Sequence, residues 1–331
     1  MGSIPKIVST PLKWASKQLL HRTLLRFPGG DAHNAIACVY CPEMCRFSCP
    51  TAVASGNDAV TPCNKMSLLH KEERWPGRAA GGGPLWPIYD CTGCGRCSEY
   101  CVYGMPVAEQ LFEARRQFAW EPAREAARAM SDAEDPVGDL ADELGDGETA
   151  TRRLEAFVAS RGSPLRAEEP RSVEFLRSRE HEAQLTWEAA LDLRSAETLQ
   201  ACRTLLAGKS WLVHESVWLS RRLGKAEQVD RWVRDAREAG IQLVQPFHHG
   251  KDCIDCGGEG AYARLFGEQA RRMALDFWER DRHRAQGIVC MSRRCAEHLR
   301  SALDGMGGLD KEVSIVSLSE ILQNQKERVS P

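Results

Sequence analysis

Eight of the fourteen cysteines of this chain fall into two short runs, and their spacing constrains the fold more than any other feature. The second run follows the pattern C-x2-C-x2-C-x3-C without deviation. This spacing lets three thiolates of one tight loop reach three irons of a cubane cluster, while the fourth points away. The runs therefore predict iron–sulfur chemistry. Their members are Cys38, Cys41, Cys45 and Cys49 in the first and Cys91, Cys94, Cys97 and Cys101 in the second.

Paired C-x-x-C motifs are also typical of structural zinc sites, where four thiolates from two loops surround the metal. Zinc has no use for a third cysteine two residues further on and a fourth three beyond it, so iron–sulfur is the favoured interpretation. In two-cluster ferredoxins the fourth cysteine of each run ligates the other cluster. The pattern then predicts two 4Fe–4S clusters, one held by Cys38, Cys41, Cys45 and Cys101 and one by Cys91, Cys94, Cys97 and Cys49.

The first run departs from the usual spacing by one extra residue, which places Cys45 where Met44 would otherwise stand. A longer loop can still wrap a cubane, but it can alternatively hold a three-iron cluster. Val102 follows Cys101, where a proline is common. Cys63 has no assigned partner, and we expect it to be buried as a small apolar side chain.

Length and composition describe an ordinary globular protein with room for about two domains. The 331 residues are 43% hydrophobic and 27% charged, with a formal net charge of -2. This charge, and the lack of a basic patch rich in aromatic residues, argue against nucleic acid as a partner. No apolar run of about eighteen residues and no secretory signal occur, so we expect a cytoplasmic protein whose cysteines bind metal rather than form disulfides.

The N-terminal segment, residues 1–30, contains basic residues and no acid. Its apolar positions recur at near-helical spacing, so residues 11–27 are predicted to form a basic amphipathic helix. Such a helix packs most often against its own domain, but it also suits an anionic membrane surface or a partner protein. Peripheral contact with the inner membrane is therefore one expectation for this segment.

Changes in composition predict three further segments. Residues 31–130 hold both cysteine runs and end in a helix-prone stretch, which predicts a helical two-cluster ferredoxin-like domain. Residues 131–165 are predicted to be an acidic, solvated linker, because residues 131–150 contain eight acids and no lysine or arginine. Residues 166–331 follow as a second domain.

The last third of the chain alternates short apolar runs with helical patterns, which indicates a mainly parallel sheet. Ser317-x-x-Glu320 has the form of a capping box that opens the final helix. The predicted fold class is therefore a multi-domain α+β protein, in which an α/β domain follows the helical cluster domain. The expected strands are residues 211–214, 241–245, 287–291 and 313–316, and the expected helices are residues 226–239, 261–282, 294–303 and 319–327.

Four more cysteines lie in the α/β region, near the ends of the expected strands. Because ligands of open α/β sheets bind at the carboxyl ends of the strands, these thiols are expected to converge. Their convergence predicts a metal, and the spacing leaves open a third iron–sulfur cluster, a zinc ion or an unmetallated remnant. His214, His248 and His249 lie at the same ends and are expected to be polar loop or supporting residues rather than ligands. The four cysteines are Cys253, Cys256, Cys290 and Cys295.

This region resembles the cysteine-rich CCG domain. The resemblance rests on the stretch from Trp211 to Gly224, on Cys256-Gly257-Gly258-Glu259-Gly260-Ala261, and on Ile288-Val289-Cys290 with Cys295. That domain occurs in the catalytic subunit of heterodisulfide reductase, the iron–sulfur subunit of glycolate oxidase and the anchor subunit of anaerobic glycerol-3-phosphate dehydrogenase. A two-cluster ferredoxin module commonly precedes it in those proteins, and the order in this chain is the same.

The chain departs from the family motif at three places. Val217 stands where the family has its first cysteine, Asp255 replaces the first of an adjacent pair, and the last pair is widened to Cys290-x4-Cys295. Relatives that cleave disulfides use non-cubane clusters that need the full cysteine set, so these replacements argue against that chemistry. Cys253 creates a new pair with Cys256 and restores a count of four thiols.

The strongest motif favours an iron–sulfur electron-transfer protein, or a subunit of a redox complex, that relays single electrons through two 4Fe–4S clusters. Its expected partners are a flavoprotein or dehydrogenase and an acceptor, because the chain carries no flavin or nicotinamide fingerprint. The chain itself would then be a non-catalytic subunit of an oxidoreductase. Two alternatives stay open: a heterodisulfide or thiol-disulfide reductase-like enzyme that uses the C-terminal cysteines, and a structural role in which metals only stabilise the fold.

Overall fold

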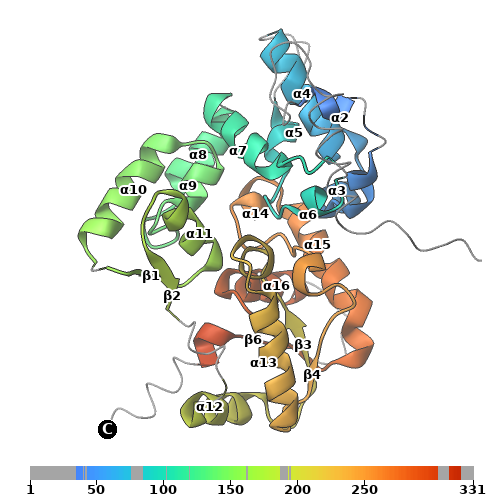
Figure 1. Cartoon of the computed structure of the whole chain (residues 1–331), viewed down its shortest axis with the longest axis vertical. Helices are drawn as coiled ribbons and strands as arrows, with labels where there is room; N and C mark the ends of the chain where they lie inside the picture. The colour runs from blue at the N-terminus through green and yellow to red at the C-terminus, as the bar shows by residue number, and fades with distance from the viewer. Residues whose placement is uncertain are drawn as a thin grey trace, which may run out of the picture.

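The computed structural model describes residues 35–39, 41, 43–75, 85–101, 103–118, 120–161, 163–186, 193, 195–304 and 313–321. A helical region carries both cysteine runs, a smaller mixed region follows it, and an α/β region comes last (Figure 1). This architecture confirms the predicted α+β class with parallel strands. The amphipathic helix predicted at residues 11–27 lies outside the described residues.

The helical region consists of short helices joined by irregular loops. Four of its helices have proline in their first turn, where the missing N–H needs no partner inside the helix. The stretch predicted to be helical after the second run contains two helices, as expected. The elements are α2 (Ile36–Val39), η1 (Met44–Ser48), α3 (Pro50–Ser55), η2 (Asp58–Val60), α4 (Pro62–Arg74), α5 (Trp86–Tyr89), α6 (Arg96–Glu99), α7 (Val107–Gln117) and α8 (Glu121–Ala129).

Residues 131–165 do not form the solvated linker that their acidity suggests, although the domain boundaries themselves stay a prediction. Helices occupy much of this segment, and the carboxylates of Asp135 and Asp139 are almost fully buried. Arginines outside the cation-free stretch 131–150 neutralise them: Arg153 of the same segment pairs with Asp135, and Arg171 and Arg294 from later segments pair with Asp139. A sequence window without a cation cannot reveal such long-range pairing. The elements of this mixed region are α9 (Asp139–Glu143), α10 (Gly147–Ala159), β1 (Leu165–Ala167), α11 (Pro170–Ser178) and β2 (Ala183–Leu185).

The α/β region contains a four-stranded parallel sheet in the order β4-β3-β5-β6. The four strands coincide with the four expected apolar runs, and three of the expected helices follow them. Strands β1 and β2 form a separate two-stranded parallel sheet that the sequence patterns did not predict. The elements are α12 (Ala196–Leu206), β3 (Trp211–His214), η4 (Trp218–Arg222), α13 (Ala226–Glu238), β4 (Leu243–Val244), η5 (Gly250–Asp252), α14 (Tyr262–Leu265), α15 (Gly267–Asp281), η6 (Arg282–Arg284), β5 (Gly287–Cys290), α16 (Arg293–Asp304) and β6 (Ser314–Ser317).

Alternate side chains of the central strands enter two different apolar clusters, as the two-residue repeat of a strand requires. Trp211, Val213 and Val289 pack with side chains of α11 and α13. Leu212 and Ile288 pack on the other face with side chains of α15 and α16. Both faces of the sheet are therefore covered, which explains why every residue of β3 and β5 is buried.

The predicted capping box after β6 is confirmed. The backbone N–H of Ser317 donates to the Glu320 carboxylate at 2.7 Å, and the backbone N–H of Glu320 donates to the Ser317 hydroxyl at 3.3 Å. The two residues thereby satisfy donors that the start of a helix leaves without intrahelical partners.

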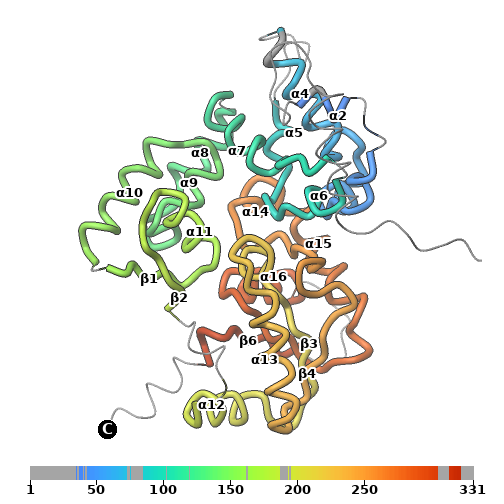
Figure 2. The backbone as a smooth tube through the Cα atoms, in the orientation of Figure 1, coloured from blue at the N-terminus to red at the C-terminus, as the bar shows by residue number. Residues whose placement is uncertain are grey.

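The α/β region contacts the helical region directly. Helix α15 packs against α3, and α14 contacts α8, so α14 and α15 lie against the part of the chain that carries the cysteine runs (Figure 2). Tyr262 of α14 donates its hydroxyl to Asp90 at 2.8 Å, and Arg96 of α6 pairs with Asp252 at 2.9 Å. Within the described residues, no helix is long and apolar enough to cross a membrane.

Candidate metal centres

Cysteines of the first run lie together with the last cysteine of the second run. Cys38 is in α2, Cys45 is in η1, and Cys101 follows α6. Burial raises the pKa of the Cys38 thiol, and negative charge on Cys101, Cys45 and Cys41 raises it further. Burial and the charges of Cys41, Cys63, Cys101 and Cys49 raise the pKa of Cys45 to about 12. Electrostatic influence of this kind acts over short distances, so Cys101 lies near cysteines of the first run; their joint ligation of one cluster stays a prediction.

Cys63 is a further thiol beside this first set. It is buried, as expected, and its Sγ donates to the Cys38 carbonyl at 2.8 Å. Burial and the nearby Glu43 carboxylate raise its pKa to about 11. Its place next to the first set was missed, because a cysteine at the start of α4 has no local spacing that relates it to the first run.

The second predicted set shares a cavity. Three cysteines of the second run and Cys49 of the first all line it. Cys49 immediately precedes α3, and Cys97 lies in α6. Burial and the charges of Cys94, Cys91 and Cys49 raise the pKa of Cys97 well above its usual value. Cys49 of the first run thus lies in the same cavity as three cysteines of the second run, and their joint ligation of one cluster stays a prediction.

A buried lysine lies beside the second set. Lys65 is 1% exposed and donates to the Thr51 hydroxyl at 3.1 Å, and this hydroxyl lies 3.3 Å from the Cys49 Sγ. Burial alone would lower the pKa of Lys65, but the charges of Cys49, Cys91 and Asp90 outweigh it and raise the pKa. A fully buried ammonium needs anionic neighbours. A cluster held by four thiolates carries net negative charge, so the donor set and its buried cation fit such a group.

The four C-terminal cysteines do not all meet. Cys253 lies in a small apolar cluster with Cys94, Val217 and Trp218, on the side of the second N-terminal set. The Arg221 guanidinium holds this junction, because it donates to the carbonyl of Cys253 at 2.8 Å and also to that of Cys94. Val217, which stands where the CCG motif has its first cysteine, is thus part of the contact between the two regions.

The other three cysteines share the sheet face that α15 and α16 cover. Cys290 is fully buried at the end of β5, opposite His214 in the register of the sheet. Cys256 and Cys295 lie in the same apolar cluster. The predicted four-thiol set stays a prediction, and its members are divided between this cluster and the neighbourhood of Cys94.

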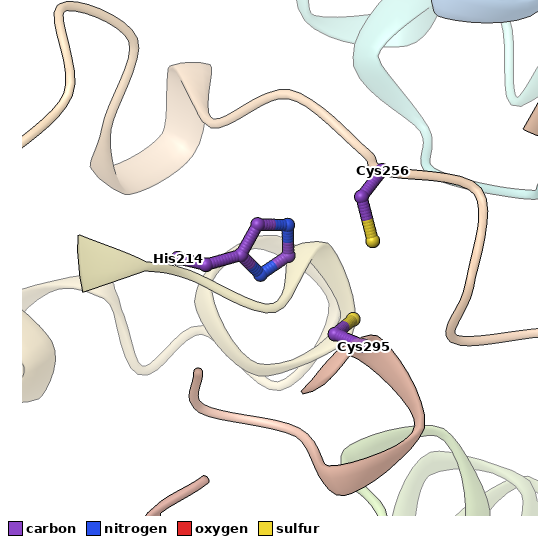
Figure 3. Close-up of side chains that lie close together, drawn as sticks. All are labelled: His214, Cys256 and Cys295. Carbon is purple, nitrogen blue, oxygen red and sulfur yellow. The ribbon is translucent and has the colours of Figure 1, made fainter. Parts of the chain in front are cut away.

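His214, Cys256 and Cys295 form a compact donor group that could hold a metal ion. Their ligand atoms all lie within 4.8 Å of one another, and all three residues are buried. They come from the end of β3, the loop after η5 and the first turn of α16, and their side chains point toward a common centre (Figure 3). The sequence patterns indicate a supporting residue rather than a ligand at His214. The pairing of β3 with β5, which places His214 opposite Cys290, brings it near these thiols.

The donor group is electrostatically asymmetric. A hydrogen bond from Cys295 lowers the pKa of Cys256 well below that of a free thiol, and His214 lowers it further. Burial would lower the pKa of His214, but the Cys256 thiolate and Asp255 raise it overall. Burial raises the pKa of Glu259 well above the usual range of a carboxylic acid. The group therefore combines a readily ionised thiol with a histidine, and both are metal ligands.

Two glycines allow the Cys256 loop to lie close to α15 and α16. Gly257 has a φ of 84°, and a Cβ at this position would lie 3.0 Å from the Ala270 Cα. A Cβ on Gly258 would lie 2.3 Å from the Cβ of His298, closer than two carbons can approach. These glycines thus serve close packing that positions Cys256.

The other two histidines behave as the polar loop residues that the sequence predicts. His248 Nδ1 contacts the Asp252 carboxylate and lies 3.3 Å from an Arg96 nitrogen. His249 Nδ1 lies 3.2 Å from the Pro246 carbonyl oxygen. Neither belongs to the donor group of His214.

The cysteine-rich region from Cys38 to Cys101 and the buried histidine–cysteine group thus provide donors suited to metal or iron–sulfur binding. A comparison with protein-family models, with curated proteins and with solved structures finds no match to this chain.

Proposed function

We propose that this chain is an iron–sulfur electron-transfer protein that relays single electrons through two 4Fe–4S clusters. The observation that supports the proposal is that one cysteine of each run lies near cysteines of the other run. Cys49 shares a cavity with Cys91, Cys94 and Cys97, while Cys101 acts electrostatically on Cys38. Structural zinc sites do not require each cysteine run to lend one ligand to the other run's site, whereas this crossed ligation is typical of two-cluster ferredoxins.

When bound, each cluster supplies one-electron reduction and oxidation. The chain contributes ligands, exclusion of water and local charge. Apolar side chains with no exposed surface, including Met66 and Met105, pack in the same cluster as Cys38 and Cys97. Lys65 adds a positive charge beside the second set. Low polarity and nearby charge are among the features that set the reduction potential of a cluster.

Electron exchange with a partner requires access to at least one set, and a cleft of about 360 Å³ reaches Cys49. Its lining includes Met44, Phe47 and Val53, and the Phe47 side chain is 82% exposed. Exposed apolar side chains around a polar cleft are typical of protein docking sites. We therefore place the contact with a redox partner, a flavoprotein or dehydrogenase or its acceptor, at this cleft.

The test is a metal count on protein purified and reconstituted without oxygen. We expect about eight irons per chain, and two one-electron transitions in a redox titration followed by electron paramagnetic resonance. A three-iron spectrum from oxidised protein would assign the smaller cluster to one set and revise the proposal there. Fewer than about four irons, together with stoichiometric zinc in the N-terminal region, would overturn it.

A matched control comes from Cys202, which is buried in the core that packs on α13 and lies apart from both N-terminal sets. Cys202→Ser should keep the full iron content. Loss of iron in this variant would mean that folding, rather than ligation, controls the count.

A thiol-disulfide reductase is the second candidate, and the neighbouring thiols of Cys256 and Cys295 are the observation in its favour. Both residues are at most 1% exposed, so a disulfide substrate does not reach them in this structure. Disulfide reduction that Cys256→Ser and Cys295→Ser both abolish would support this candidate. Unchanged activity in either variant would exclude it.

A further inference from the structure

The strand order creates a binding position at the carboxyl end of the four-stranded sheet. Strand β3 has β4 on one side and β5 on the other, so the chain leaves β3 in one direction and later returns past it. Ligands of open α/β sheets bind where the strand order reverses in this way. His214 ends β3, and Cys295 lies in the first turn of the helix that follows β5.

One buried side chain at this position, His214, has polar atoms that its protein surroundings do not satisfy. His214 is 1% exposed, and neither ring nitrogen has a hydrogen-bond partner of normal geometry within the described part of the chain, although the Cys256 thiolate acts on the ring electrostatically. Leaving a buried polar group without a partner costs about 1–3 kcal/mol. The His214 ring packs edge-on against Phe277 at a centroid distance of 4.6 Å, which fixes its plane but satisfies neither nitrogen. A metal bond to one nitrogen would satisfy it.

The spacing of the donors suits one ion rather than a cluster. Zinc bonds of about 2.0–2.3 Å in a tetrahedral site put the ligand atoms roughly 3.3–3.8 Å apart. The atoms of His214, Cys256 and Cys295 lie within 4.8 Å of one another, so a small contraction closes the site. Thiolates around a cubane stand farther apart because each binds a different iron. A histidine with two thiolates is a zinc donor set.

A carboxylate lies beside one of these donors, Cys295. Glu259 is 1% exposed, and one of its oxygens is 4.0 Å from the Cys295 Sγ. The Ser216 hydroxyl contacts both carboxylate oxygens, at 2.5 and 2.6 Å, and so holds the group in place. A divalent cation at this place would stabilise the ionised forms of the two thiols and of the two buried acids, Asp255 and Glu259.

We propose that His214, Cys256 and Cys295 bind a single zinc ion at the carboxyl end of the sheet, with Glu259 as the oxygen donor for the fourth position. The ion ties the end of β3 to the loop after η5 and to the start of α16. It stabilises the α/β region and takes no part in the iron–sulfur relay. Cys253 and Cys290 are not ligands.

The first test is elemental analysis of the full chain, with zinc and iron counted separately. We expect about one zinc per chain. Cys256→Ser and Cys295→Ser should lose the zinc and keep the iron, whereas Cys290→Ser and Cys253→Ser should keep both metals. Loss of iron instead of zinc in Cys256→Ser would show a third cluster here and overturn the proposal. Zinc that is absent from the wild type, or lost equally in Cys290→Ser, would also overturn it.

A second measurement does not depend on removing a ligand. Cobalt should replace the zinc in the otherwise wild-type protein and give a thiolate-to-cobalt charge-transfer band with the intense visible absorption of a tetrahedral site. X-ray absorption at the zinc edge should show two sulfur and two lighter ligands. Four sulfur ligands would contradict the proposed set. Because these spectra report zinc or cobalt alone, their outcome is separate from the iron count that tests the relay.

Glu259→Gln isolates the fourth position while it keeps the shape of the side chain. We expect zinc affinity to fall by about 10- to 100-fold, the usual effect of removing a supporting group at a metal site. Unchanged affinity in a competition titration with a chelator would remove Glu259 from the set. Glu297→Gln is the matched control, because Glu297 pairs with Arg293 in the same helix as Cys295.

Discussion

The two parts of this molecule that gather cysteines are built in opposite ways. The N-terminal cysteines come from two short, closely spaced runs that lie on short helices and the irregular loops between them, so the members of each run are local in sequence. The group of His214, Cys256 and Cys295 takes one donor from each of three distant segments, and a regular sheet brings them together. Local sequence spacing therefore predicts the N-terminal cysteine sets, whereas the group of His214, Cys256 and Cys295 becomes visible only from the topology of the sheet.

The difference also separates what depends on metal from what does not. Small cluster domains lack enough regular structure to fold without their metals. The sheet region has two apolar clusters of its own, one on each face. The experiments below break or sharpen this contrast, beginning with the largest expected effect.

The crossed ligation predicts that Cys49→Ser and Cys101→Ser each remove about half of the iron, roughly four of eight atoms, because each variant opens one cluster. The two variants should lose different electron paramagnetic resonance signals, because each keeps a different cluster. Cys63→Ser is the control: it removes a thiol that lies beside the first set but donates to the Cys38 carbonyl, and its iron content should be unchanged. Iron at the wild-type level in Cys49→Ser would contradict the claim that Cys49 ligates a cluster.

The buried ion pairs of Asp139, which join α9 to α11 and α16, predict the second largest effect. Asp139 of α9 is 1% exposed and contacts Arg171 of α11 and Arg294 of α16. Asp139→Asn leaves two buried guanidinium groups short of a charge, so the free energy of unfolding should fall by about 3–5 kcal/mol. Urea denaturation followed by circular dichroism measures this loss. Asp132→Asn, at a carboxylate that is 71% exposed, should change little, and an equal loss there would contradict this explanation.

The buried lysine predicts that the two N-terminal sets differ in potential. Lys65→Met removes a positive charge beside the second set and should make its reduction potential more negative by on the order of 80 mV. A unit charge at an effective dielectric constant of about 20 and a distance of about 7–10 Å contributes about 2 kcal/mol. Redox titration with resonance detection measures both clusters. Lys71→Met, at an exposed position of the same helix, should shift neither, and an equal shift of both clusters in Lys65→Met would contradict the local effect.

The contact between α6 and η5 predicts the smallest effect. Burial alone would raise the pKa of Asp252, but hydrogen bonds from His248, Tyr100 and Arg96 lower it to about 2. A carboxylate with a depressed pKa stabilises the fold above its unfolded pKa and loses this contribution only as the pH falls through the folded value. Asp252 is 42% exposed, so Asp252→Asn should cost less than about 1 kcal/mol. The difference between variant and wild type should stay constant from about pH 5 to pH 8, and a decline within that range would contradict the low pKa.

Part of this structure was readable from the sequence because the signals were local. The four strands of the large sheet appear as short apolar runs, and the capping box of Ser317 and Glu320 lies within one turn. The spacing of the two cysteine runs is local in the same way, and the ligand sets that it predicts stay a prediction. In each of these cases the interacting residues are neighbours in sequence, or share a pattern that repeats along it.

The remainder could not be read because the partners are distant. The acids around Asp139 looked solvated, since Arg171 and Arg294 that neutralise them lie outside the window. His214 looked like an ordinary polar residue at a strand end, and only the pairing of β3 with β5 brings it to the two cysteines. Cys253 looked like the replacement for a lost thiol, yet it packs with Val217, which occupies the position of that thiol in the family motif.

One buried side chain determines where this protein can be divided. Arg115 donates to the carbonyl of Cys91 at 2.6 Å and lies 3.7 Å from the Glu143 carboxylate, which accepts from the Ala261 backbone N–H at 2.6 Å. A fragment that ends at Met130 would keep both cysteine runs but would lack Glu143. Arg115 would then be a buried charge without its carboxylate partner. We therefore expect that the part of the chain that carries the cysteine runs does not fold stably alone, because it depends on contacts with the segments that contain Glu143 and Ala261.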